Sequence, residues 1–407
     1  MTGPLTGIRV IEVGGIGPGP FAGMLLADLG AEVIRVDRPT RGKDLGSHRI
    51  LFRGRRSITL DLKQERGRGL LADLLSTADA LIEGFRPGVM ERLGLGPEVL
   101  IARNPALVYG RMTGWGQDGP LAMTAGHDIN YIAVAGALEP LAGPDLAPKP
   151  PLNMLGDFGG GGMLLACGLL AALLHARETG AGQVVDAAVV DGTALLTSML
   201  HGMRAGGDWQ APRGENRLDG GAPYYGVYRA ADGGWLAVGA IEPQFYAQLL
   251  HGLGLAGEFR EVAQNDRSAW PRVRARFAER IAERTRDEWA GVFAGTDACV
   301  SPAIAPHEVK DHAHVDARGT FIEDGGLLQP APAPRFGGTP LTLPGPAPVP
   351  GADTRGLLRE MGLTDGEIDE LIAARTAGPP GTVAGEEQAP VELLGDPGAE
   401  VPPSTMR

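Results

Sequence analysis

The sequence is poor in cysteine, and this scarcity excludes two classes of protein. Its 407 residues include only Cys167 and Cys299. Two cysteines cannot form the disulfide framework of a small secreted protein, and their spacing fits no metal-binding motif. We therefore expect a protein of a reducing compartment, the cytoplasm, without a metal site.

The chain also lacks a surplus of positive charge and a membrane-length apolar run. Its net charge of -12 argues against a nucleic-acid-binding protein. Residues 1–15 have neither the basic flank nor the long apolar core of a signal peptide. The longest apolar run, Met163 to Leu174, contains a glycine and is too short to span a bilayer, so it predicts a buried helix. The last residues, Ser-Thr-Met-Arg, differ from the peroxisomal Ser-Lys-Leu address.

Strands alternate with helices over the first half of the chain. Short β-branched runs predict strands, and apolar residues at helical spacing predict the helices between them. This alternation predicts an α/β domain with a Rossmann-like parallel sheet. The predicted strands are 8–13, 31–37, 79–85, 105–116 and 182–190, and the predicted helices are 21–29, 70–78, 163–174 and 192–203.

The remainder predicts a second domain and two connectors. We expect the large α/β domain over residues 1–203, completed by two short helices within residues 354–377, the second capped by Thr364. A smaller α+β domain is expected to begin with a hairpin that turns at residues 231–234. The other boundaries are a linker over 204–222, the small domain over 223–322, a Pro-rich connector over 323–353 and a disordered tail over 378–407.

Two familiar motifs do not carry the function. Asp157 begins an Asp-Phe-Gly triplet, but the chain has no kinase His-Arg-Asp loop and no paired strand lysine. Residues 17–22 fit the dinucleotide pattern G-x-G-x-x-G/A, with Asp37 about twenty residues later. Pro18 and Pro20 remove backbone N–H groups that would face a pyrophosphate, which favours a plain strand-to-helix turn.

Positive charge is concentrated in one segment of this acidic chain. Residues 41–56 contain six Lys or Arg and one Asp. The segment is either a solvated loop or a site where arginines grip the phosphates of a small polyanion. Lys63, Arg86 and Arg92 follow predicted strands, where an α/β sheet presents its ligands.

Three ionisable residues are candidates for catalysis. His127 lies in a Gly-His-Asp-Ile-Asn sequence. Asp157 is followed by one phenylalanine and then by four glycines, and Glu242 precedes a proline. Each also has an ordinary structural explanation: a packed histidine, an aspartate that caps a helix, and a surface glutamate. Taken one at a time, these residues assign no function.

Together, these segments resemble a known superfamily. Residues 3–375 are similar to the family III CoA-transferase (CaiB/BaiF) superfamily, and within it to the α-methylacyl-CoA racemase group. The resemblance implies the α/β fold described above, an intertwined homodimer and an acyl-CoA thioester as substrate, with no nucleic acid or membrane as partner. The matching segments are 3–39, 60–63, 81–97, 109–120, 125–133, 153–162 and 182–192.

The resemblance also implies an activity. Racemases of this group invert C2 of 2-methyl-branched acyl-CoA through an enolate, and they match this chain at His127, Asp157 and Glu242. His127 and Asp157 would act as bases on opposite faces, while Glu242 holds the other nitrogen of His127. Members that transfer CoA between acids instead use the aspartate as a nucleophile, and this alternative stays open, as does an acyl-CoA-binding protein without activity. No metal or redox cofactor is implied, because CoA is part of the substrate.

The same resemblance implies the substrate contacts. The glycines 159–162 would let the thioester approach the main chain, and the N–H of Asp157 or a neighbour would donate to the enolate oxygen. Met154 and Met163 would either contact the acyl tail or pack in the core. The expected CoA contacts are Arg38, Leu60, Asp61, Leu62, Lys63, Gly84, Phe85, Arg86, Arg92, Gly126, Asp128, Ile129, Asn130 and Tyr131.

Overall fold

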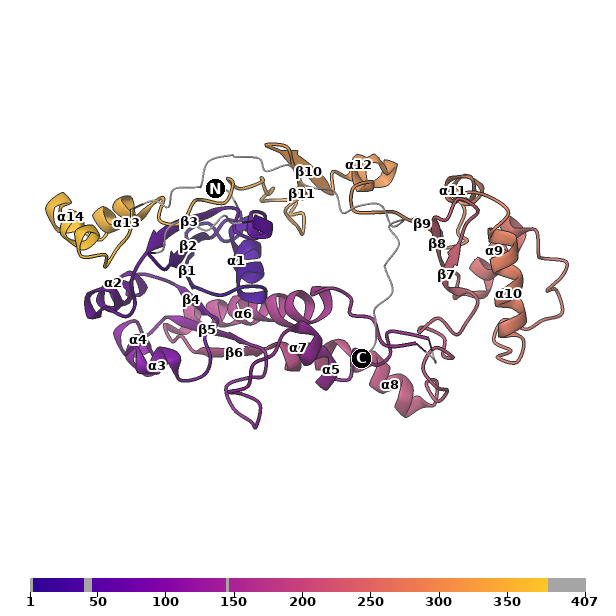
Figure 1. Ribbon diagram of the computed structural model, residues 1–407, viewed down its shortest axis with the longest axis horizontal. Coiled ribbons are helices and arrows are strands. Elements are labelled where there is room, and N and C mark those ends of the chain that lie inside the picture. The colour runs from indigo at the N-terminus through magenta and orange to yellow at the C-terminus, as the bar shows by residue number, and fades with distance from the viewer. Residues whose placement is uncertain (1–2, 40–45, 144–145, 380–407) are drawn as a thin grey trace, which may run out of the picture.

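The large domain is built on a six-stranded parallel sheet (Figure 1). The computed structural model describes residues 3–39, 46–143 and 146–379. The strand order is β3-β2-β1-β4-β5-β6, the Rossmann order, in which the direction of strand addition switches between β1 and β4. The predicted fold class is therefore confirmed. The strands are β1 (Arg9–Val13), β2 (Glu32–Asp37), β3 (Arg55–Thr59), β4 (Ala80–Glu83), β5 (Val108–Thr113) and β6 (Val184–Ala188).

Strand β3 was not predicted, because it begins with two arginines inside the basic segment. Arg55 is buried in the sheet and pairs with the buried Glu12 at 2.8 Å. Arg53 pairs with the buried Asp28 at 2.5 Å, and Arg56 forms ion pairs at the domain surface. A buried arginine is tolerated here because its carboxylate partner compensates the charge. The polyanion-site interpretation is therefore wrong for these three arginines, while 41–45 lie outside the described residues.

Helices cover both faces of the sheet and form two cores. Neighbouring strand residues point to opposite faces, so Val10 packs in one core and Ile11 in the other. Leu26 of α1 and Leu169 of α6 are fully buried in the first core. The helices of the first core are α1 (Pro18–Asp28) and α6 (Leu164–Thr179), and those of the second include α2 (Glu65–Leu75), α3 (Val89–Arg92) and α4 (Pro97–Arg103).

The second core is completed by two helices that follow the Pro-rich segment. Helices α13 (Thr354–Glu360) and α14 (Asp365–Ala373) place Leu358 and Ile368, both fully buried, among the residues of this core. The predicted cap of α14 is confirmed, since the Thr364 hydroxyl accepts from the Glu367 N–H at 3.4 Å and the Glu367 carboxylate accepts in return at 2.8 Å.

The segment before and within α6 departs from the prediction. A ten-residue π-helix, η2 (Met154–Met163), runs directly into α6. The continuous helical segment Met154–Thr179 has 26 residues and a mean hydropathy of 1.7, and it alone in the described residues is long and apolar enough to cross a membrane. The expectation of a short helix is therefore wrong in length, although Leu165 and Leu169 pack in the core as expected.

Two more helices, α5 (Asp128–Val134) and α7 (Val189–Leu196), pack against η2, and α8 (Ser198–Gly206) follows α7. The predicted single helix 192–203 is thus two helices, which meet at Thr197.

The small domain is a three-stranded antiparallel sheet covered by helices. Its order is β7-β8-β9, and the predicted hairpin is confirmed as β7 (Tyr225–Arg229) and β8 (Trp235–Gly239). Its core contains the fully buried Leu249, Phe277 and Trp289. The further elements are β9 (Val300–Ala303), α9 (Pro243–Leu253), α10 (Trp270–Ile281) and α11 (Arg286–Phe293), followed by α12 (Ala313–Arg318), β10 (Phe321–Asp324) and β11 (Leu327–Pro330).

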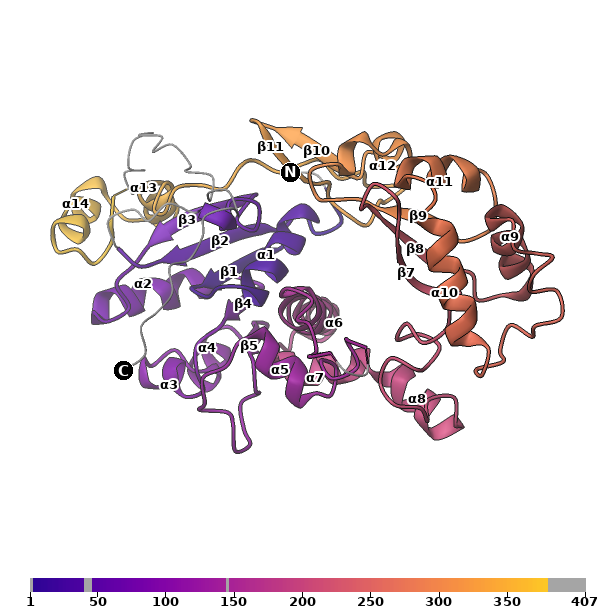
Figure 2. The same ribbon diagram turned by 45° about the vertical axis from the view of Figure 1, so that its right-hand side comes forward.

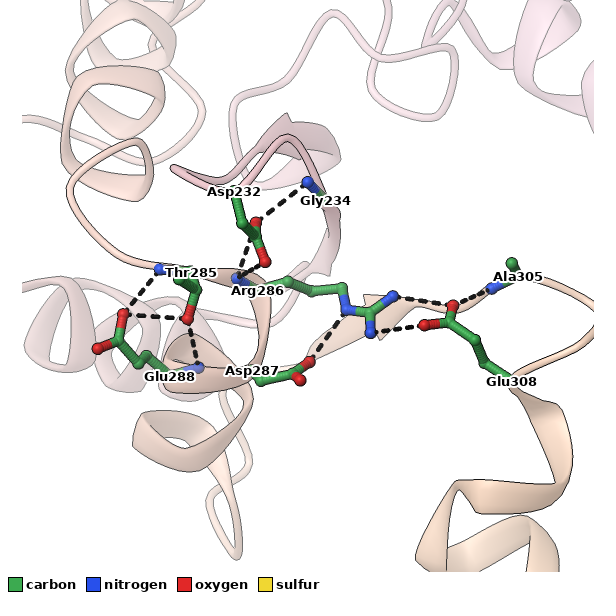
Figure 3. Close-up of polar contacts among 8 residues, drawn as sticks. All are labelled: Asp232, Gly234, Thr285, Arg286, Asp287, Glu288, Ala305 and Glu308. Atoms are coloured by element: carbon green, nitrogen blue, oxygen red, sulfur yellow. Dashed lines mark hydrogen bonds and ion pairs between the residues drawn. The ribbon is translucent and has the colours of Figure 1, made fainter.

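A polar cluster fastens the hairpin turn to α11 (Figure 3). The Asp232 carboxylate accepts from the N–H of Gly234 at 3.1 Å and from that of Arg286 at 3.2 Å. The Arg286 guanidinium grips Glu308 through two bonds of 3.0 and 2.9 Å and holds the pKa of Glu308 at about 2. These contacts are internal to the small domain and orient its helices around the sheet.

The two domains lie side by side and are joined by two connectors (Figures 1 and 2). One connector follows α8, and the other is the Pro-rich segment between β11 and α13. The buried Arg53 ties the β11 strand to the large domain by donating to Gln329 at 3.0 Å and to the Pro330 carbonyl at 2.8 Å.

Candidate functional site

The structure brings His127 and Asp157 together on neighbouring helices. His127 is the N-cap residue of α5, with an exposed side chain, and its N–H donates to the Asn130 side-chain oxygen at 3.0 Å. Asp157 is half-buried in the first turn of η2, which packs against α5. The two groups are close enough for the charge of His127 to lower the proton affinity of Asp157.

The surroundings of Asp157 raise its proton affinity overall. Burial is the largest cause of its raised pKa, and the charge of Asp128 acts in the same direction. A hydrogen bond from Asn153 to the Asp157 carboxylate, at 3.4 Å, opposes the rise. A carboxylate with a raised pKa is a stronger base, which suits the removal of a weakly acidic proton.

Gly17 limits the space beside this carboxylate. It precedes α1 with a positive φ of 69°, and a Cβ on it would lie 3.0 Å from Asp157 Oδ2. The rejected dinucleotide motif therefore contributes to the site in another way, as the turn that faces Asp157. Gly17 and Asn153 were not predicted as site residues. For Asn153, the signal was its position four residues before Asp157.

The four glycines after Asp157 serve helix packing more than ligand approach. Gly160, Gly161 and Gly162 are buried, and a Cβ on any of them would collide with α1 or α7. The nearest atoms would be Thr193 at 2.6 Å for Gly160 and the Phe21 ring at 2.7 Å for Gly162. The expectation that all four make room for a thioester is therefore wrong, and only Gly159 is half-exposed.

The main-chain N–H of Asp157 is already engaged. It donates to Asp128 Oδ1 at 2.6 Å, so the expectation that this N–H stabilises an enolate oxygen is wrong, while the alternative of a neighbouring N–H stays a prediction. Asp128 is itself only 7% exposed and turns its side chain toward η2. Asp128 thus differs from the next two residues, Ile129 and Asn130, whose side chains are exposed.

An aromatic pair supports the turn before His127. The Tyr131 hydroxyl donates to the Gly126 carbonyl, and the Tyr131 ring meets Trp115 edge-on at 4.8 Å. Burial and the charge of Asp157 raise the pKa of Tyr131, which places this ring beside the carboxylate. The buried indole N–H of Trp115 has no hydrogen-bond partner among the described residues.

Glu242 is not part of the same cluster within one chain. It is the exposed N-cap residue of α9 in the small domain, while His127 begins α5 in the large domain. Both views show α9 well apart from α5 (Figures 1 and 2). Burial and, after it, the charge of Glu242 raise the pKa of the Cys299 thiol. Glu242 is therefore close to Cys299 within one chain.

The expected CoA contacts gather where the parallel strands end. Arg38 follows β2, Lys63 follows β3, and Arg86 follows β4, and all three side chains are exposed. Gly84 lies between β4 and Arg86, and Arg92 is exposed at the end of α3. These cations flank the switch between β1 and β4, where Rossmann folds bind their ligands.

Other expected contact residues face the protein. Leu60 is 1% exposed in the core, and its N–H donates to the Asp37 carbonyl. The half-buried Phe85 packs on the same core, and Leu62 does so as well. Asp61 accepts from the Lys63 N–H at 3.0 Å. These residues shape the edge of the sheet, while the exposed cations beside them are free to face a ligand.

One buried acid at this edge was missed. Glu83 ends β4, is 3% exposed and accepts from the Phe85 N–H at 2.8 Å. Burial raises its pKa to about 7, although Arg111 lies 3.6 Å away. The sequence signal was a glutamate at the end of an otherwise apolar strand.

No group of three or more His, Cys, Asp or Glu that could hold a metal occurs in the described ranges. Both cysteines are unpaired and exposed.

The comparisons with known proteins agree with this geometry. The family model "CoA-transferase family III" matches residues 5–354. The chain is 47% identical over 375 residues to the alpha-methylacyl-CoA racemase of Mus musculus, covering 91% of this chain and 97% of the relative. It is 32% identical over 406 residues to the succinyl-CoA–D-citramalate CoA-transferase of Chloroflexus aurantiacus, covering 91% of this chain and 98% of that one. The crystal structure of a CAIB/BAIF family protein from Brucella suis matches with a TM-score of 0.77 at 27% identity, covering 89% of this chain and 100% of that chain. This chain belongs to CoA-transferase family III.

Proposed function

We propose that the protein catalyses racemisation at C2 of 2-methyl-branched acyl-CoA thioesters. The observation that carries the proposal is the pairing of His127 with a half-buried Asp157 of raised pKa. The identity to a racemase, 47%, exceeds the identity to a CoA-transferase, 32%, at equal coverage of this chain. Two adjacent groups that each accept and donate a proton match what inversion of a carbon centre requires.

The reaction removes one proton from C2 and returns one proton to it. One base removes the proton from C2, and the electron pair moves onto the thioester oxygen as an enolate. The protonated partner then delivers a proton to the opposite face of C2, which inverts the centre. His127 and Asp157 exchange these roles with the direction of the reaction, and neither step needs a metal or a redox cofactor.

The CoA part of the substrate lies along the edge of the sheet where the strands end. Arg38, Lys63, Arg86 and Arg92 attract its phosphates, and Gly126 to Tyr131 lead the pantetheine arm toward His127. Burial and hydrogen bonding assign Asp128 and Leu60 supporting roles instead of direct contacts.

The acyl tail extends over the apolar surface around η2. Met154 and Met163 are 57% and 53% exposed, so the core-packing alternative for them is wrong. Flexible methionines form a surface that accommodates chains of different shape.

Glu242 completes the site from a second copy of the chain in an intertwined homodimer. In one chain Glu242 lies in the other domain from His127, and exposed apolar side chains on α6, α7 and α8 offer a surface for association. The protein is proposed to act in the cytoplasm.

Deuterium exchange tests the activity. One epimer of a 2-methylacyl-CoA is incubated with the protein in deuterated water, and optical purity and α-deuterium are measured without any acceptor acid. Loss of optical purity together with deuterium incorporation supports racemisation, and Asp157→Asn should abolish both while leaving CoA affinity largely unchanged. If CoA moves only after a second carboxylic acid is added, and hydroxylamine traps an adduct at Asp157, the transferase alternative is correct. Binding of CoA without either reaction would indicate an acyl-CoA-binding protein.

A further inference from the structure

Asp128 lies directly behind the catalytic aspartate. Its side chain is 7% exposed, and its Oδ1 accepts the main-chain N–H of Asp157 at 2.6 Å. Its other oxygen, Oδ2, is buried and has no hydrogen-bond partner among the described residues. A buried carboxylate with one unpaired oxygen is costly, so a purely structural role would be served as well by a neutral side chain.

The contact depends on a close approach of the two helices. A Cβ on Gly156 would lie 2.4 Å from Asp128 Oδ1, so only glycine lets the Asp128 carboxylate reach the main chain here. The bond joins the first turn of α5, which His127 caps, to the first turn of η2, which holds Asp157. One side chain therefore fixes the relative position of the two proposed bases.

The charge of Asp128 also acts on Asp157. A negative group nearby disfavours the ionised form of a carboxyl, and Asp128 contributes to the raised pKa of Asp157 after burial, while His127 opposes it. The charged side chains that act on Asp157 belong to α5 and its cap: Asp128 and His127. Burial and, after it, the charge of Asp157 raise the pKa of Tyr131, which also lies on α5. The other packed helices present the neutral residues Gly17, Pro18 and Phe21 from α1 and Val189 and Thr193 from α7 to η2.

We propose that Asp128 is a positioning residue for the reaction: its carboxylate holds the main chain of Asp157 in place beside His127. The negative charge of Asp128 supports this role, because it favours the protonated form of Asp157 and so makes Asp157 a stronger base. The proposal rests on the racemase function given above. A more basic Asp157 removes the weakly acidic C2 proton more readily.

Two substitutions separate the charge from the hydrogen bond. Asp128→Asn keeps an oxygen that accepts from Asp157 N–H but removes the charge, whereas Asp128→Ala removes both. In Asp128→Asn the acid limb of the pH profile of kcat/KM should move to lower pH, because the Asp157 carboxylate loses its negative neighbour. In Asp128→Ala the same shift should be accompanied by a further fall in kcat of about tenfold or more, because Asp157 is no longer held in place. The KM for CoA esters should stay near its original value in both.

Asp191→Asn is the matched control, since Asp191 is an exposed carboxylate on α7, which packs against the same π-helix. Its pH profile should match that of the unaltered enzyme. An unshifted acid limb in folded Asp128→Asn, checked by its melting temperature, would overturn the proposal.

A titration that needs no turnover separates this inference from the function it rests on. The carboxyl resonance of Asp157, assigned by its loss in Asp157→Asn, is followed against pH by carbon-13 NMR of aspartate-labelled protein. Its midpoint should be lower in Asp128→Asn than in the unaltered protein, and equal midpoints would contradict the proposed charge effect. Absence of α-deuterium exchange in the unaltered protein, by contrast, would refute the racemase function whatever the titration shows.

Discussion

At the scale of single residues, the space and the contacts around Asp157 are fixed by residues that take no part in the proposed proton transfer. Gly17 leaves room for the carboxylate and takes a positive φ that other residues adopt only at a cost. Asn153 and Asp128 then hold its side chain and its main chain. The position and basicity of Asp157 therefore depend on residues that do not themselves exchange a proton with the substrate.

Gly17→Ala tests this dependence. The new methyl group would lie 3.0 Å from Asp157 Oδ2 and should displace the carboxylate, so kcat should fall about tenfold or more. Gly7→Ala is the matched control, because Gly7 has a φ of 87° with open space around its Cβ position. Both variants should lose about 1 kcal/mol of stability from backbone strain. The idea fails if the two lose activity equally.

The sequence predicted the two proposed bases better than the residues that support them. His127 and Asp157 stand in recognisable motifs, and the fold brings them together. The support from Asp128 was hidden, because the side chain points inward from a segment of otherwise exposed residues. The direction of the Asp128 side chain depends on how α5 packs against η2. The sequence does not predict η2 itself, because no residue preference marks a π-helix.

At the scale of elements, the ends of the parallel strands carry the proposed CoA contacts. Five of the six strands were predicted, since apolar β-branched runs dominate a buried parallel sheet. Strand β3 was missed because Arg55 satisfies its charge through Glu12, a partner 43 residues away that no local pattern reveals. Arg53, Arg55 and Arg56 of the basic segment are thus committed to the fold by partners that lie far away in the sequence.

Arg86→Ala should separate phosphate binding from catalysis. Arg86 is exposed after β4, so its loss should raise the KM for a CoA ester about tenfold and leave a truncated pantetheine ester nearly unaffected. Arg56→Ala is the control: Arg56 pairs with Glu32 and Glu360, so its loss should cost about 1 kcal/mol of stability and no CoA affinity. An equal loss for both esters in Arg86→Ala would contradict a phosphate contact.

Glu83 makes the end of β4 sensitive to pH. Burial raises its pKa from 4.5 to about 7, so the folded protein retains a proton that the unfolded chain loses. Its contribution to stability is therefore fully present below about pH 4.5 and is lost as the pH rises through about 7.

Glu83→Gln keeps an acceptor for the Phe85 N–H and removes this titration. Relative to the variant, the original protein should lose on the order of 3 kcal/mol of unfolding free energy between pH 4.5 and pH 8. Urea unfolding at a series of pH values measures the difference. A constant difference between the two proteins across this range would show that Glu83 does not titrate there.

At the scale of the whole molecule, one chain does not assemble the three proposed catalytic residues. Glu242 and His127 belong to different domains, and the exposed apolar residues of α6, α7 and α8 have no partner within the described part of the chain. They include Leu174, Leu195, Leu196 and Met199, which are 67%, 63%, 53% and 67% exposed. Such a surface is typical of an interface between subunits. The sequence of one chain shows that these residues are apolar but does not show which surface covers them.

Mixed dimers test whether Glu242 acts across that interface. Chains with His127→Ala and with Glu242→Ala should each be nearly inactive alone. In a heterodimer whose sites combine His127 from one chain with Glu242 from the other, one site carries both substitutions and the other carries neither. Co-expression with random pairing should therefore restore about one quarter of the original α-proton exchange, because half of the dimers would have one intact site of two. If Glu242 acts within its own chain, every site carries one defect and no activity returns. The control is a mixture of His127→Ala and Asp157→Asn chains. Both residues belong to the large domain, so this mixture should stay inactive in either case.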